Sequence, residues 1–174
     1  MTASGANEIT YEGAADRDMA ELVRSEIRAM VGELHPTPFE MREGRWPVSY
    51  ATDAPRFGPP CVWLQVGNPI ETRVRLRDGR IDQTQWKAGH VAMSMAIQGL
   101  DRSIDGRDIM RGFMIVFQHP ETRELMGVNS YYDDHSLIDG IHLPVNRNVV
   151  LLRDGEPMRR ELVLRGHRVL RAGG

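Results

Sequence analysis

The part of the chain from residue 112 to residue 170 alternates short apolar segments with turn sequences, a pattern typical of consecutive β-hairpins. Phe113 to Phe117 is apolar at every position, as expected for a central, buried strand. Asp154-Gly155 is a dipeptide favoured in tight hairpin turns. Residues 70–77 alternate in polarity and lead into a second such dipeptide, Asp78-Gly79. The sequence therefore predicts a meander of about seven antiparallel strands.

Residues 90–98 fit two kinds of secondary structure. Val91, Met93, Met95 and Ile97 alternate with polar or small side chains, as in a strand, but the same segment also contains an apolar stripe at helical spacing. We favour a strand because segments with β patterns flank it on both sides and Gly89 precedes it.

The N-terminal part of the chain has a different pattern. Residues 1–15 are predicted to form a flexible tail. From Asp16, apolar residues recur every three or four positions, which predicts a helix that ends near Gly32, before His35-Pro36. The proline-rich residues 36–60 also contain aromatic side chains, so we expect an ordered loop that covers the core. A disordered segment is the alternative.

A helix followed by a long meander predicts an α+β fold. Because strands twist, a long meander curls. We therefore expect the N-terminal helix to pack on a strongly curved antiparallel sheet, a roll or open β-barrel that encloses an apolar cavity. The length of 174 residues fits one domain, which we place at residues 16–174.

Composition excludes several classes of protein. A net charge of −2 and a pI near 6.3 argue against nucleic acid as a partner. No window approaches the run of about 20 apolar residues that a membrane helix needs. The single cysteine, Cys61, excludes an intramolecular disulfide and a thiolate zinc site. No nucleotide-binding, nucleophile-elbow or zinc-peptidase motif occurs, so we expect no metal and no cofactor. Residues 1–15 lack the apolar core of a secretory signal, which predicts a cytoplasmic protein.

One polar cluster, Tyr131-Tyr132-Asp133-Asp134-His135, stands out beside the apolar segments. We expect it at a corner where a strand ends. His135 can exchange a proton near neutral pH, and Asp133 or Asp134 could orient its ring. Tyr131 or Tyr132 would donate a hydrogen bond to developing charge. On a strand, alternate residues share a face, so only one phenol–carboxylate pair can point into a cavity. A solvated turn is the alternative.

A second set of residues is predicted to line the cavity. Small side chains alternate from Ala92 to Ala96, and His90 at their start could face a ligand or serve as a structural histidine. Methionines nearby suit a pocket that adapts to irregular apolar ligands. The predicted ligand-binding residues are Trp63, Trp86, His90, Phe113 and Phe117.

The segment from Tyr132 to Pro144 resembles a corner of known carrier proteins. Asp139-Gly140 and Pro144 match the Asp-Gly-x-x-x-Pro corner of lipoprotein-carrier folds of the LolA type. The resemblance implies a hydrophobic cavity and does not by itself assign the chain to that family.

The sequence thus supports three functional hypotheses. The first is a cofactor-independent lyase, isomerase or cyclase that acts on a hydrophobic or aromatic small molecule by general acid–base chemistry. The second is a non-catalytic carrier or sensor of such molecules, with a lipocalin-like or LolA-like cavity. The third is a subunit, possible in a homo-oligomer, whose apolar sheet face pairs with a partner.

Overall fold

The structure is a computed structural model that describes residues 17–34, 43–52, 61–104, 106 and 108–168. Contacts within the chain divide it into two compact units, Met1–Pro38 and Phe39–Gly174. The first unit contains the helix α1 (Arg17–Leu34), which confirms the predicted helix and extends it two residues beyond Gly32. Asp18 lies in its first turn, where a carboxylate interacts favourably with the helix dipole. Among the described residues, no helix has the length and apolarity needed to cross a bilayer.

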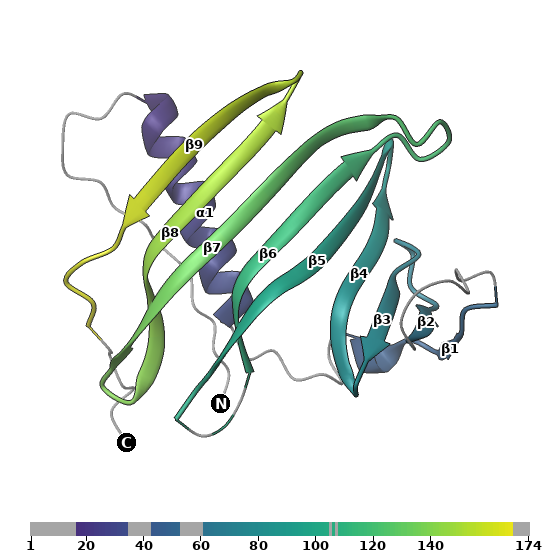
Figure 1. The fold of residues 1–174 in the computed structure, drawn as a ribbon, viewed down its shortest axis with the longest axis horizontal. Helices are drawn as coiled ribbons and strands as arrows, with labels where there is room; N and C mark the ends of the chain where they lie inside the picture. The colour runs from purple at the N-terminus through teal and green to yellow at the C-terminus, as the bar shows by residue number, and fades with distance from the viewer. Residues whose placement is uncertain (1–16, 35–42, 53–60, 105, 107, 169–174) are drawn as a thin grey trace. The chain divides into compact units, whose positions relative to one another are not determined.

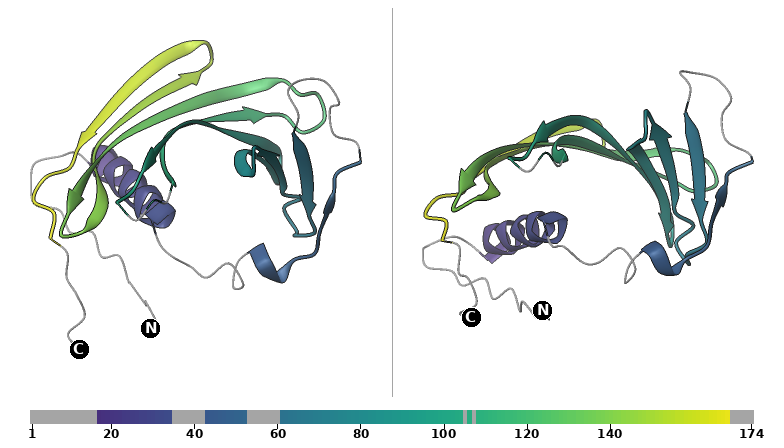
Figure 2. Two further views of the ribbon diagram at one scale, coloured as in Figure 1. Left: turned by 60° about the horizontal axis from the view of Figure 1, so that its bottom comes forward. Right: turned by 90° about the horizontal axis from the view of Figure 1, so that it is seen from below.

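The second unit is built on one antiparallel sheet (Figure 1). Its nine strands within the described residues follow one another in sequence order, so the predicted meander is confirmed. In the left view of Figure 2 the colour runs from blue to yellow across the sheet, in agreement with this order. The strands are β1 (Val48–Tyr50), β2 (Val62–Val66), β3 (Arg73–Arg77), β4 (Arg80–Ala88), β5 (Val91–Arg102), β6 (Asp108–Gln118), β7 (Leu125–Ile138), β8 (Ile141–Arg153) and β9 (Glu156–Val163).

The sheet is open within the described residues, because β1 and β9 pair only with β2 and β8. The preference for a strand at residues 90–98 is confirmed, since β5 covers Val91–Arg102. The proline-rich segment contains the short helix η2 (Glu43–Arg45) and β1, which were not predicted. Residues 35–42 and 53–60 lie outside the described residues, as does the tail at residues 1–15. The packing of the helix on the sheet, the strong curvature and the enclosed cavity stay predictions.

Asp-Gly turns join three pairs of strands. Asp78-Gly79 has φ angles of 51° and 74°, Asp139-Gly140 of 51° and 81°, and Asp154-Gly155 of 53° and 80°. Two successive positive φ angles define the type I′ turn, whose twist matches that of the flanking strands. These dipeptides therefore specify the β3–β4, β7–β8 and β8–β9 hairpins directly from sequence.

Strand pairing sorts the side chains onto two faces of the sheet. The first, which we call the Phe113 face, carries large apolar side chains from β4, β5 and β6, in register across the strands: Trp86, Met93, Met95, Ile97, Phe113, Ile115 and Phe117. The buried Val149, Leu151 and Leu162 belong to the same face. The other, which we call the Arg73 face, carries polar side chains on β2 to β5: Gln65, Arg73, Arg75, Gln83, Gln85 and Ser94.

Candidate functional site

Residues 131–135 lie inside β7, so the prediction that they form a corner is wrong. The strand continues to Ile138, and the turn is made by Asp139-Gly140. The polar sequence does not end the strand because partners on β8 stay paired with it. The Asp side chains are bound by arginines of neighbouring strands rather than by the local backbone.

The two tyrosines and two aspartates alternate between the faces. Tyr131 pairs with Val149 and Asp133 with Arg147, which places both on the Phe113 face. Tyr132 and Asp134 lie on the Arg73 face. The pairing then shifts after Asp134, and β8 accommodates the shift with one extra residue. The expected division into two phenol–carboxylate pairs on opposite faces is therefore present in β7.

On the Phe113 face, Asp133 forms a buried ion pair with Arg147. Arg147 Nε donates to Asp133 Oδ1 at 2.7 Å, and Nη2 donates to Oδ2 at 2.6 Å. Asp133 is 2% exposed and Arg147 is 0% exposed. Both charges are isolated from water, and the ion pair compensates for the loss of hydration. The carboxylate of Asp133 is thus held by an arginine rather than by His135.

Aromatic rings surround this ion pair. Phe113 and Tyr131 stack with 4.6 Å between their ring centroids and 11° between their planes. The guanidinium carbon of Arg147 lies 5.4 Å from the Tyr131 centroid and 5.8 Å from that of Phe113. The Tyr131 hydroxyl accepts a hydrogen bond from Asn129 Nδ2 at 3.1 Å. We call Asn129, Tyr131, Asp133, His135 and Arg147 the β7 cluster.

On the Arg73 face, Arg111 contacts both members of the second phenol–carboxylate pair, Tyr132 and Asp134. Its Nη2 lies 3.5 Å from Asp134 Oδ1, and its Nη1 lies 3.5 Å from Asp101 Oδ1. Its guanidinium carbon is 4.8 Å from the centroid of the Tyr132 ring. Asp134, like Asp133, therefore has an arginine as its partner.

His135 is half-buried, and its Nδ1 has no hydrogen-bond partner among the described residues. Burial lowers the pKa of His135 below its usual 6.5, and this effect outweighs the opposite influence of Asp133 and Asp101. Electrostatic interactions with His142 and Arg147 lower the pKa further. The ring is therefore neutral at pH 7 and can accept a proton.

The predicted ligand-binding residues lie in three places. Trp86, Phe113 and Phe117 share the Phe113 face, because Met93 pairs with both Trp86 and Phe117. Trp63 lies on the opposite face, where the guanidinium carbon of Arg75 is 5.7 Å from its ring centroid. His90 is exposed in the turn between β4 and β5. The structure thus brings three of the five together.

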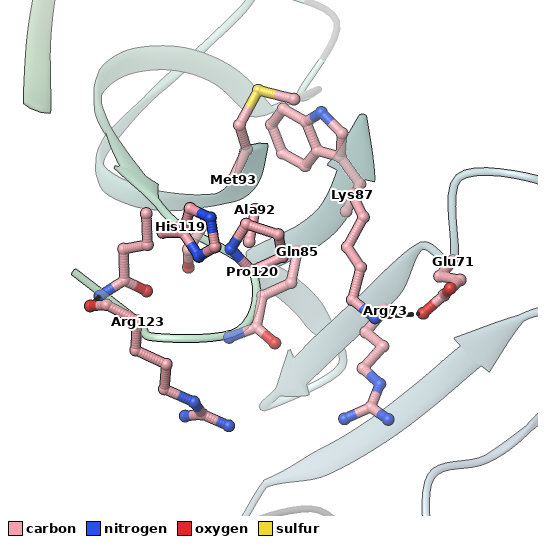
Figure 3. Close-up of a pocket in the computed structure, with 12 residues that line it drawn as sticks. Glu71, Arg73, Gln85, Lys87, Ala92, Met93, His119, Pro120 and Arg123 are labelled. Carbon is pink, nitrogen blue, oxygen red and sulfur yellow. Dashed lines mark hydrogen bonds and ion pairs between the residues drawn. The ribbon is translucent and has the colours of Figure 1, made fainter. Parts of the chain in front are cut away.

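A pocket of about 330 Å³ lies on the Arg73 face, between β3, β4, β5, the end of β6 and the turn that follows it (Figure 3). The polar side chains that line it include Arg73, Gln85, Lys87, Ser94, Gln118 and Arg123. We call it the cationic pocket. The only indication of this pocket in the sequence is the arginine at every second position of β3. An ordinary solvated strand shows the same pattern, so the sequence does not identify a pocket. The turn residues that complete the pocket could not be assigned to it from sequence.

Comparisons with protein families, with curated proteins and with solved structures found no match for the chain. The resemblance of residues 132–144 to lipoprotein carriers therefore stays a prediction. Among the described residues, no three His, Cys, Asp or Glu side chains gather in the way that a metal site requires.

Proposed function

We propose that the protein binds a hydrophobic or aromatic small molecule on the Phe113 face of the sheet. The supporting observation is the in-register set of large apolar side chains on β4, β5 and β6. Several of them, including Met95 and Phe117, are only half-buried. A ligand that covers such apolar surface gains about 25 cal/mol of binding free energy for each Å² that it removes from water. In this proposal the sheet curves around the ligand and forms one wall of an apolar cavity.

The partners of Asp133 and Asp134 favour a carrier or sensor over an enzyme. Asp133 is paired with Arg147 and Asp134 with Arg111, so both candidate orienting groups have other partners. A binding protein needs no orienting carboxylate. The ion pair of Asp133 and Arg147 would then fix the Phe113–Tyr131 stack that faces the ligand.

A cofactor-independent lyase, isomerase or cyclase is the second candidate, and His135 favours it. The half-buried, neutral ring has an Nδ1 atom with no partner among the described residues. Such a nitrogen could take a proton from one atom of a bound molecule and return it to another. In this candidate His135 would work without an orienting carboxylate.

Binding is tested with N-phenyl-1-naphthylamine, a neutral aromatic dye that fluoresces in apolar surroundings. We expect saturable binding to the full chain, and weaker binding after Met95→Gln, which puts an amide on the Phe113 face. Met114→Gln is the matched control, because Met114 is equally half-buried on the opposite face. Equal affinity for both variants would contradict the proposal, provided that circular dichroism shows both to be folded.

The two candidates are distinguished with the natural ligand. Mass spectrometry of the denatured protein would identify a molecule that co-purifies with it. An enzyme converts that molecule, and His135→Gln then loses turnover while it retains binding. A carrier binds the molecule unchanged in both forms.

A further inference from the structure

We propose that the cationic pocket binds the carboxylate or phosphate group of a small molecule. Three cationic side chains, Arg73, Lys87 and Arg123, line it together with a single carboxylate, Glu71. The chain as a whole carries a net charge of −2, so this positive concentration is a local feature. Its charged side chains lie on the face of the sheet opposite the apolar ligand site proposed above, although Trp86 and Met93 of that site also line the pocket.

Glu71 interacts with two of the three cations, because Lys87 and, to a smaller extent, Arg73 lower its pKa. Lys87 Nζ donates to Glu71 Oε2 at 2.7 Å, and Lys87 lowers the pKa of Glu71. Arg73 is held differently, because its Nε donates to the neutral amide oxygen of Gln65 at 2.8 Å. This contact positions the guanidinium group at the wall of the pocket, where an anion would be a further partner.

Arg123 reaches the pocket from a constrained turn. Its backbone N–H donates to His119 O at 3.0 Å, and its φ of 60° lies in the left-handed region, which costs a non-glycine residue free energy. Among the described residues, Arg123 has no carboxylate partner. Figure 3 shows the guanidinium groups of Arg73 and Arg123 on the same side of the pocket, with the amide of Gln85 directed toward the space between them.

Neutral donors complete the pocket. His119 Nδ1 accepts hydrogen bonds from the N–H groups of Glu121 and Thr122, each at 3.3 Å. A ring nitrogen that accepts carries no hydrogen, so the neutral ring keeps its hydrogen on Nε2, where it can donate. Ser94 Oγ accepts from Gln83 at 2.6 Å and still has its own hydrogen to donate. These groups suit the oxygen atoms of an anion.

The size and chemistry of the pocket indicate the class of ligand. A volume of about 330 Å³ fits a small molecule, at the lower end of the range for such sites. Guanidinium groups bind carboxylate and phosphate through two parallel hydrogen bonds, a geometry that other anions do not match as well. We therefore infer a small metabolite with one of these two groups.

The test is isothermal titration calorimetry on the full chain with inorganic phosphate and, separately, malonate, at constant ionic strength set by chloride. We expect saturable binding of at least one of them, and the stronger ligand distinguishes a phosphate site from a carboxylate site. Arg123→Gln and Arg73→Gln should each weaken binding by about tenfold or more, because each removes charge-assisted hydrogen bonds. Arg159→Gln is the control, since it makes the same charge change at an exposed position on the same face.

Two results would overturn the proposal. One is the absence of saturable binding for both anions. The other is equal affinity in Arg123→Gln and Arg159→Gln, which would leave only a general charge effect. Arg123 is exposed in a turn, so its variant should fold even if Arg73→Gln does not. Binding of the neutral dye should be unchanged in Arg123→Gln, which separates this site from the apolar face.

Discussion

The β7 cluster and the cationic pocket both contain arginines, but these arginines differ in their burial and in their partners. Arg147 is fully buried, and two oxygens of Asp133 lie within 2.7 Å of its guanidinium group. Arg73 is half-buried and interacts with the neutral amide of Gln65, while Arg123 is exposed. A buried charge must be compensated inside the protein, whereas an exposed charge stays available to a ligand. Arg147 therefore serves the fold, and the exposed Arg123 is the arginine on which the proposed binding most depends.

The largest expected difference between the two regions is in stability. Asp133→Asn removes the negative charge and leaves Arg147 charged and buried, which should lower the free energy of unfolding by about 3–5 kcal/mol. Arg123→Gln, at an exposed position of the pocket, should change it by no more than about 0.5 kcal/mol. Urea denaturation of both variants measures the contrast.

A double variant provides the control for this prediction. Asp133→Leu with Arg147→Met replaces both charges by apolar side chains, and should be more stable than Asp133→Asn because neither buried charge remains. If Asp133→Asn lowers the free energy of unfolding by less than about 1 kcal/mol, the buried Arg147 does not need the charge of Asp133. The proposed difference between the β7 cluster and the cationic pocket would then be wrong.

The hairpins could be predicted from sequence because their signals are local. Asp78-Gly79 and Asp154-Gly155 adopt the positive φ angles that the dipeptide favours. The alternation over residues 90–98 identified β5 for the same reason. β1 was missed because a three-residue strand between prolines has no period of its own, and it forms by pairing with β2.

The site could be predicted only in part. Tyr131 and Asp133 were expected on one face, and the alternation of β7 places them there. Arg147, the partner of Asp133, is 14 residues further along the chain, and the register that joins the two depends on the turn and the extra residue of β8. The cationic pocket is assembled from four strands, β3 to β6, and from the connections before β3 and after β6. No local pattern encodes such contacts, so they were not found.

The second prediction concerns the backbone of Arg123. Replacement by glycine removes the steric cost of its left-handed φ of 60°, partly offset by the greater freedom of the unfolded chain. We expect Arg123→Gly to leave stability unchanged or raise it by up to about 1 kcal/mol. Phosphate or malonate binding should nevertheless weaken as in Arg123→Gln.

The control is Arg153→Gly, because Arg153 lies in β8 and is not among the residues with positive φ. Glycine there should lower stability by about 0.5–1 kcal/mol. If Arg123→Gly is destabilised as much as Arg153→Gly, the turn does not store strain. Thermal unfolding of the two variants under the same conditions gives the answer.

The smallest expected effect is the pH dependence that His135 gives to the β7 cluster. Its pKa is lowered in the folded protein, chiefly by burial, so between that value and 6.5 the unfolded chain binds more protons. Its contribution to stability is therefore complete above pH 6.5 and is lost as the pH falls through the lowered pKa. His135→Gln should remove this part of the slope, so that the difference in unfolding free energy between wild type and variant, constant near pH 8, shrinks toward pH 5. A difference independent of pH would show that His135 titrates alike in both states, and the neutral, sheltered ring of the proposed enzyme would lose its support.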